Sequence, residues 1–300
     1  MWDGFFVRSR LKIEQNNQEK QLKTVFIIAV PRSGTSWLQG MLANLPEIAT
    51  VRETHLVDGY LKGMVDSWHK EQQQKHPDGL KAILTEAEFY EYIKSFSNRI
   101  LAKISEFNPG AEIVLEKTPD NLNFVPLLNR LYPEAYFIHV IRDPRAVVAS
   151  HLALKQEKWG WIAQGENQVD LAQRWVRGME QRDRAATLLE ERFLEVRYED
   201  LKCDRDAVLL RVIDFLALNY TKEQLSQLIP NVSASDLDRN KANLPSHNPF
   251  FDTRPNFFRR GEIDSWKEEL TQEQIIDVEA ICIRSMIAYG YQPQYLKINL

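Results

Sequence analysis

Five side chains of the sequence have the chemistry needed to bind an anion and to move a proton beside it. Arg32, Lys117 and Arg142 each stand at the end of an apolar run. Guanidinium and ammonium groups bind phosphate or sulfate oxygens. Glu53 and His55 lie two residues apart in a short polar piece, and either side chain can act as an acid or a base. Together these residues predict an anion site with a candidate base, although the piece with Glu53 and His55 could also be a solvated loop.

The clearest anion-binding pattern surrounds Arg32. Residues 24–30 are apolar without polar alternation, as in a central parallel strand, and Pro31 ends the run. A helical pattern begins at Thr35, so a phosphate before it would meet helix N–H groups, hydroxyls and a guanidinium. Gly34 allows the backbone to approach a ligand closely. The alternative is an ordinary strand-to-helix turn with a surface arginine.

This turn is not a Walker A loop. That pattern requires GxxxxGK[ST], and no second glycine here is followed by lysine. Asp143 could mimic the acid that binds metal in Walker-type proteins, but its place before Pro144 fits a helix N-cap more simply. Both observations argue against an ATPase or an ordinary kinase.

Apolar runs alternate with helical patterns along the chain. Four runs are predicted as strands: residues 24–30, 112–117, 135–141 and 192–198. Such alternation predicts a parallel sheet with right-handed crossovers and helices on both faces. Ligands bind beyond the carboxyl ends of such strands, so Arg32, Lys117 and Arg142 should converge. We predict an α/β fold, a single P-loop-like domain whose central parallel sheet is flanked by helices.

Two segments are expected to form lid insertions over this edge. Residues 56–84 are mixed and polar and predict a helical excursion, whereas residues 231–258 lack periodicity and predict a binding loop. Between them, a capping box at Thr85 opens a long amphipathic helix. The aromatic residues of this helix, including Tyr92 and Phe96, are expected in the core.

The bulk properties predict one domain over residues 24–300 after an N-terminal arm over residues 1–23. The 300 residues are 44% hydrophobic, enough for one large core, and the net charge of −4 gives no general attraction to nucleic acid. No run approaches the ~18 apolar residues of a spanning helix, so we expect a cytoplasmic protein without a membrane span. Cys203 and Cys282 show no metal or disulfide pattern and are expected to be buried. Nothing in the sequence indicates an oligomeric state.

With these residues placed, the chain resembles the sulfotransferases that use 3′-phosphoadenosine 5′-phosphosulfate (PAPS). The similarity spans about residues 25–291 and rests on four segments in order: VPRSGTSW at 30–37, VIRDPRAVVAS at 140–150, RYEDL at 197–201 and FRRGEIDSWK at 258–267. Arg32 stands where many cytosolic members have lysine, and Asp264, Ser265 and Trp266 stand where they have Gly-Asp-Trp. The loop arginine is closer to the protein-tyrosine, carbohydrate and bacterial branches.

The resemblance implies a binding site for PAPS and for its desulfo product PAP. The residues implied to hold the 5′-phosphosulfate are Arg32, Ser33, Gly34, Thr35 and Ser36. Trp37 is implied to stack on adenine and Tyr198 to contact the base, although Trp37 could be core and Tyr198 a strand-end anchor. The residues implied at the 3′-phosphate are Arg142, Ser150, Arg259, Arg260 and Gly261, with Ser150 alternatively a helix-surface hydroxyl.

The resemblance also implies roles in the transfer step. Glu53 is implied as the base for the acceptor hydroxyl, with His55 as the alternative base. Lys117 is implied beside the bridging oxygen of the donor, and Arg32 adds charge at the transferring group. Side chains can neutralise the charge of PAPS, and the sequence shows no metal-ligand spacing, so no metal ion is expected.

Two other classes of function stay open at this point. A P-loop nucleotide or small-molecule kinase would depend on ATP and Mg²⁺. A PAP-binding or scaffold protein would bind the nucleotide without transferring any group. For a sulfotransferase, the acceptor is expected to carry a hydroxyl, on a small molecule, a glycan or a peptide tyrosine, and the sequence does not choose among them.

Overall fold

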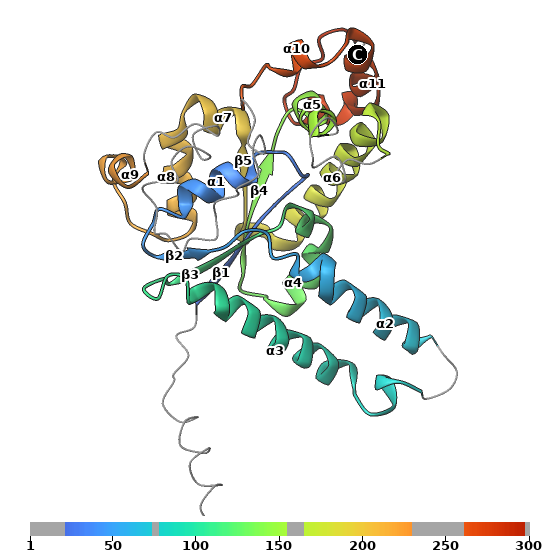
Figure 1. The fold of residues 1–300 in the computed structure, drawn as a ribbon, viewed down its shortest axis with the longest axis vertical. Coiled ribbons are helices and arrows are strands. Elements are labelled where there is room, and N and C mark those ends of the chain that lie inside the picture. The colour runs from blue at the N-terminus through green and yellow to red at the C-terminus, as the bar shows by residue number, and fades with distance from the viewer. Residues whose placement is uncertain (1–21, 74–77, 155–164, 230–260, 298–300) are drawn as a thin grey trace, which may run out of the picture.

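The computed structural model describes residues 22–73, 78–154, 165–229 and 261–297 (Figure 1). At its centre lies a sheet of five parallel strands in the order β2-β3-β1-β4-β5. The strands are β1 (Lys23–Ala29), β2 (Ile48–Thr50), β3 (Ile113–Lys117), β4 (Tyr136–Ile141) and β5 (Phe193–Arg197). The predicted α/β fold with a central parallel sheet is confirmed, and β2 is a short strand beyond the four that were predicted.

Side chains of β1 alternate between two cores, one on each face of the sheet. Val25 and Ile27 face one core, whereas Phe26 and Ile28 face the other. The helices of the first face are α1 (Thr35–Leu42), α7 (Tyr198–Cys203), α8 (Arg205–Phe215) and α9 (Lys222–Leu228). Those of the second are α3 (Glu86–Ser105), α4 (Val125–Leu131), α5 (Pro144–Leu154), α6 (Gln168–Leu189), α10 (Trp266–Glu269) and α11 (Gln272–Ala288). The fold thus has three layers, with β1 in the middle of the sheet.

Helices α2 (Lys62–Gln72) and α3 form a helical hairpin that extends from the sheet (Figure 1). A π-helical turn over Val57–Leu61 precedes α2, as expected of a helical excursion in this segment. Trp68 and Phe89 stack at 4.3 Å between ring centroids and hold the two helices together. The capping box at Thr85 is confirmed, because Thr85 and Glu88 each accept a hydrogen bond from the backbone of the other.

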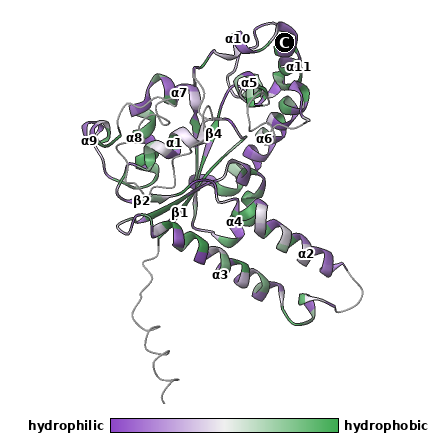
Figure 2. Ribbon diagram, viewed as in Figure 1, coloured by the Kyte–Doolittle hydropathy of each residue, from purple (hydrophilic) through white to green (hydrophobic). Residues whose placement is uncertain are grey.

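Two expectations about burial are wrong. Tyr92 is 62% exposed and Phe96 41% exposed, because no further layer covers the outer side of α3 in the α2–α3 hairpin. Figure 2 shows hydrophilic and hydrophobic residues sharing this helix. Cys203 is exposed at the end of α7, whereas Cys282 is buried as expected.

Four other predictions concern residues that the structure describes only in part or not at all. The arm over residues 1–23 and the loop over residues 231–258 lie outside them, apart from the last two residues of the arm. Within the described ranges, no helix has the length and apolar character needed to cross a membrane. The same residues contain no group of three or more His, Cys, Asp or Glu side chains that could hold a metal ion.

Candidate active site

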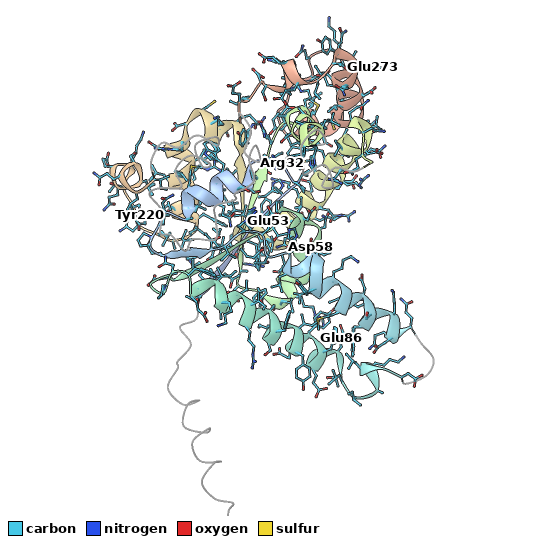
Figure 3. The ribbon with its side chains drawn as sticks, in the orientation of Figure 1. Arg32, Glu53, Asp58, Glu86, Tyr220 and Glu273 are labelled. Atoms are coloured by element: carbon cyan, nitrogen blue, oxygen red, sulfur yellow. The ribbon has the colours of Figure 1, made fainter. Side chains whose placement is uncertain are left out.

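The predicted site residues converge where the carboxyl ends of β1, β3 and β4 meet. Figure 3 places Glu53 between Arg32 and Asp58 in the middle of the molecule, whereas Glu86, Tyr220 and Glu273 lie at its outside. Strand pairing explains this convergence, because β3 and β4 both pair with β1 in parallel. The loops that follow these strands therefore share one edge of the sheet.

The loop between β1 and α1 has the geometry of an anion-binding turn. Arg32 and Gly34 have positive φ angles of 75° and 97°, and the hydroxyl of Ser33 donates to the carbonyl of Val30 at 2.7 Å. Gly34 precedes α1 and offers no side-chain cap, so an anion can take the place of a cap at these N–H groups.

Packing also requires glycine at position 34, for a reason that the sequence did not reveal. A Cβ atom at this position would lie 2.3 Å from Cδ2 of Tyr198. We expected glycine here so that a ligand could approach, yet the ring of Tyr198 already requires it. The first turn of α1 and the start of α7 are therefore fitted to each other.

Two arginines and a serine meet at this loop, as predicted. Nε of Arg32 donates to Oγ of Ser150 at 3.1 Å, and Nη1 of Arg142 donates to the carbonyl of Arg32 at 3.3 Å. The guanidinium of Arg142 lies 4.1 Å from the ring centroid of Tyr198. Nε of Arg142 is buried and has no hydrogen-bond partner among the described residues. A buried donor without a partner is costly, so this N–H is a candidate to be satisfied by an anionic ligand.

The remaining nucleotide-site predictions are placed less directly. The hydroxyl of Tyr198 donates to the carbonyl of Gly261 at 2.6 Å, which ties the late glycine to this edge. Trp37 is only 6% exposed and its ring lies 5.6 Å from that of Tyr198, so its stacking on adenine stays a prediction. Arg259 and Arg260 lie outside the described residues.

A chain of polar contacts runs from α1 to the candidate bases. Nζ of Lys117 donates to Oγ of Ser36 at 3.1 Å and to Oε1 of Glu53 at 2.5 Å. The other carboxylate oxygen of Glu53, Oε2, lies 3.5 Å from Nε2 of His55. Lys117 thus joins the anion loop to Glu53 and, through Glu53, to His55. Its place beside the bridging oxygen of a donor stays a prediction.

Electrostatics keep this carboxylate ionised. Burial raises the pKa of Glu53, but the ammonium of Lys117 and its hydrogen bond lower it more, so the pKa lies below that of an ordinary glutamate. Burial lowers the pKa of Lys117, and the Glu53 carboxylate limits that fall. The pair therefore supplies an ionised carboxylate beside a cation.

A buried carboxylate that sequence reasoning missed holds the loop of the candidate bases. Glu116, in β3, is 1% exposed and accepts hydrogen bonds from Oγ1 of Thr118 at 2.6 Å, Nδ2 of Asn121 at 2.7 Å and Oγ1 of Thr54 at 2.8 Å. Burial raises its pKa, and these hydrogen bonds oppose the rise. Thr54 lies between Glu53 and His55, so Glu116 anchors both. The available signal was a glutamate inside an otherwise apolar strand.

His151 supports the anion loop from behind and was not predicted as a site residue. It is 1% exposed, and its Nε2 lies 3.2 Å from the carbonyl of Pro31. Burial, together with the positive charges of Arg32 and Arg174, lowers the pKa of His151 to about 3. The ring is therefore neutral at pH 7, and Nε2–H donates to Pro31.

Asp143 is engaged inside the protein. Its carboxylate contacts the guanidinium of Arg145 at 2.6 Å and accepts from the N–H of Arg145 at 2.8 Å, as an N-cap does. Arg145 also reaches the fully buried Glu279 of α11 at 2.7 Å. This arrangement supports the N-cap interpretation over a metal-binding acid.

The fold and the site define an α/β protein with cationic side chains and a candidate base at the carboxyl edge of a parallel sheet. Residues 24–222 match the family model described as the Sulfotransferase family. The chain belongs to the sulfotransferase family.

Several known proteins are similar to this chain. A putative protein-tyrosine sulfotransferase of Caenorhabditis briggsae is 26% identical over 201 residues, which are 67% of this chain and 68% of the relative. Protein-tyrosine sulfotransferase 2 of Gallus gallus is 26% identical over 226 residues, 73% of this chain and 59% of the relative. The chain thus spans about three fifths of the length of the chicken relative.

Solved structures share the fold. The sulfotransferase domain from the curacin biosynthetic pathway superposes with a TM-score of 0.56 at 21% identity, covering 90% of this chain and 99% of that domain. Mouse sulfotransferase SULT7A1, in a complex with PAP, superposes with a TM-score of 0.56 at 14% identity, covering 88% of this chain and 84% of the mouse chain. These matches and the family assignment support the sulfotransferase prediction over the kinase alternative.

Proposed function

We propose that the chain transfers the sulfuryl group of PAPS to an acceptor hydroxyl. The observation that carries this proposal is Lys117, which contacts Ser36 of the anion loop and the carboxylate of Glu53 at the same time. A donor held at the loop and an acceptor at Glu53 would both lie within reach of this ammonium. Transfer of a charged group depends mainly on such positioning and on compensating charge.

The donor residues form two groups, one for each end of the nucleotide. Arg32, the hydroxyls of Thr35 and Ser36 and the N-terminus of α1 suit the 5′-phosphosulfate. Arg142 and Ser150 suit the 3′-phosphate, and the unpartnered Nε of Arg142 is the donor that such a group would satisfy. Tyr198 and Gly261 close the same edge.

In the transfer step, Glu53 accepts the proton of the acceptor hydroxyl while that oxygen attacks sulfur in line with the departing phosphate oxygen. Lys117 neutralises the charge that forms on the leaving oxygen. General-base help of this kind is worth roughly 10²–10⁴-fold in rate. The side chains present supply the required charge, and the scheme has no step that needs a metal ion.

The acceptor class follows from the relatives by analogy. The worm and chicken relatives are named as protein-tyrosine sulfotransferases, the worm protein as a putative one. A phenolic hydroxyl on a peptide tyrosine is therefore the first acceptor to test. A glycan or a small-molecule hydroxyl is the next candidate. A cytoplasmic location also stays a prediction, which fractionation of cells that express the full-length protein would test.

A thermal-shift experiment separates the donor classes. PAP should raise the melting temperature, because a ligand at 100 times its dissociation constant adds about 2.7 kcal/mol to the free energy of unfolding. ATP with Mg²⁺ should not. Labelled PAPS incubated with the chain and a tyrosine-containing peptide should then yield a sulfated peptide. A shift with ATP alone, and none with PAP, would overturn the proposal.

A further inference from the structure

The imidazole of His55 lies between two carboxylates that come from the same short segment. Nδ1 is 3.0 Å from Oδ2 of Asp58, and Nε2 is 3.5 Å from Oε2 of Glu53. A third carboxylate, Asp120, interacts electrostatically with His55, Asp58 and Glu53. Three carboxylates therefore act on this ring, and one of them is the candidate base Glu53.

The backbone holds this ring in an uncommon conformation. His55 has a φ angle of 48°, in the left-handed region that costs a residue other than glycine on the order of 1 kcal/mol or more. The turn persists because Oγ1 of Thr54 donates to buried Glu116 and the carbonyl of His55 accepts from the N–H of Gly59 at 2.9 Å. A strained turn held from both sides fixes the backbone position from which the imidazole projects.

The two distances indicate where the proton of a neutral ring lies. A neutral imidazole carries one N–H, and each of its nitrogens here faces a carboxylate oxygen. The shorter contact is with Asp58, so Nδ1 is assigned as the donor. Nε2 then presents a lone pair toward Oε2 of Glu53. Both atoms are hydrogen-bond acceptors with no proton between them, which agrees with the longer distance of 3.5 Å.

Exposure differs along this series of side chains. The side chain of Glu53 is 31% exposed, whereas that of His55 is 53% exposed. An acceptor bound against Glu53 would enclose the carboxylate further, because it takes up the space in front of it. A proton on Glu53 would therefore reach water by way of the imidazole of His55.

We infer that Asp58, His55 and Glu53 form a proton exit, in which Asp58 is a positioning residue that fixes the tautomer of His55. The inference rests on the proposed sulfuryl transfer. The acceptor O–H breaks as its oxygen bonds to sulfur, and the proton passes to Oε2 of Glu53. The S–O bond to the donor phosphate breaks, and its electron pair leaves with PAP. The proton then moves to Nε2 of His55, whose imidazolium Asp58 stabilises, and from there to water.

The test uses two phenols of different acidity. A tyrosine-containing peptide must lose its proton during transfer, whereas 4-nitrophenol is largely ionised in mildly alkaline buffer and there needs no base. Asp58→Ala should lower kcat on the peptide by about 10-fold or more, within the range of general-base effects, and on 4-nitrophenol by less than about 3-fold. Asp58→Asn keeps an acceptor for Nδ1–H and should lose less on the peptide.

Asp66→Asn is the matched control, because Asp66 lies on the same part of the chain and pairs with Lys62 away from the site. It should leave both rates unchanged. Equal losses on the two phenols, or no loss on either, would show that Asp58 has only a structural role or none, and would overturn the proton exit. An inactive wild-type chain that also fails to bind PAP would overturn the proposed function instead.

A second measurement needs no acceptor. Nitrogen-15 NMR of the PAP-bound chain, with the His55 signal assigned through His55→Gln, reports the tautomer directly. The proton should sit on Nδ1 in the wild-type chain, and Asp58→Ala should shift it toward Nε2. An Nε2–H tautomer in the wild-type chain would overturn the inference even where no acceptor is sulfated.

Discussion

The donor half of the site and its transfer half are built in different ways. In the donor half, residues 30–36 and 142–150, cations at strand ends contact backbone carbonyls and Ser150 beside helix N-termini. In the transfer half, residues 53–58, the candidate bases lie on a strained turn that buried Glu116 holds from 62 residues away. Local strand-turn-helix geometry thus forms the donor half, whereas the transfer half depends on one long-range polar network.

The largest expected effect separates the two halves by activity. Glu53→Gln removes the carboxylate that accepts the proton and should lower kcat by roughly 10²–10⁴-fold. PAP should still raise the melting temperature, because no donor contact is lost. Glu273→Gln, at the exposed start of α11, is the control. Near-full turnover of Glu53→Gln with intact PAP binding would transfer the role of base to His55.

The next prediction tests the network that holds the transfer half. Glu116→Ala leaves the hydroxyls of Thr54 and Thr118 and the amide of Asn121 without their acceptor, at about 1–3 kcal/mol for each unsatisfied group. We expect the free energy of unfolding to fall by about 3 kcal/mol in urea titrations. Exposed Glu134→Ala should change it little. A fall no larger than that of the control would show that the network does not support this half.

A third prediction tests the packing of the donor half. Gly34→Ala places a Cβ 2.3 Å from the ring of Tyr198 at a φ angle of 97°. Stability should drop by about 2 kcal/mol, and PAP should bind about 10-fold more weakly, because the loop must move. Gly63→Ala in α2 meets nothing within 4 Å and should stabilise the chain slightly. Calorimetry of both variants with PAP measures the difference, and equal behaviour would contradict the packing argument.

The last prediction is a pH dependence that arises behind the donor loop. The pKa of His151 is about 3 in the folded chain, against ~6.5 for an unfolded histidine. Between these values only the unfolded chain binds the proton, so the free energy of unfolding falls by about 1.4 kcal/mol per pH unit as pH drops below ~6.5. Burial lowers the pKa of His139 too, with the same sign. Urea titrations from pH 8 to 5 should show a shallower slope for His151→Gln, and an unchanged slope would contradict this assignment.

The sequence by itself determined the backbone frame of the donor half and the convergence of its cations on one edge of the sheet. Strand β1, the turn with Arg32 and Gly34, and the contact of Arg142 with that turn follow from apolar runs, helix caps and parallel-sheet topology, which are local rules. Capping boxes such as that at Thr85 were equally readable, because their hydrogen bonds join residues three positions apart.

Only the tertiary structure decided the supports of both halves. Burial and partners across the fold define the roles of Glu116 and His151, and the sequence offered only the glutamate in the β3 run as a signal. Asp58 lies three residues from His55, but the folded turn with its positive φ brings its carboxylate to Nδ1 of that ring. The contact of His151 with Pro31 spans 120 residues, and that of Glu116 with Thr54 spans 62. The exposed outer side of α3, with Tyr92 and Phe96, shows the same limit, since hydrophobic periodicity does not reveal whether another layer covers a helix. Local sequence rules place the cations at one edge of the sheet, and the long-range packing of buried polar groups positions the candidate bases beside them.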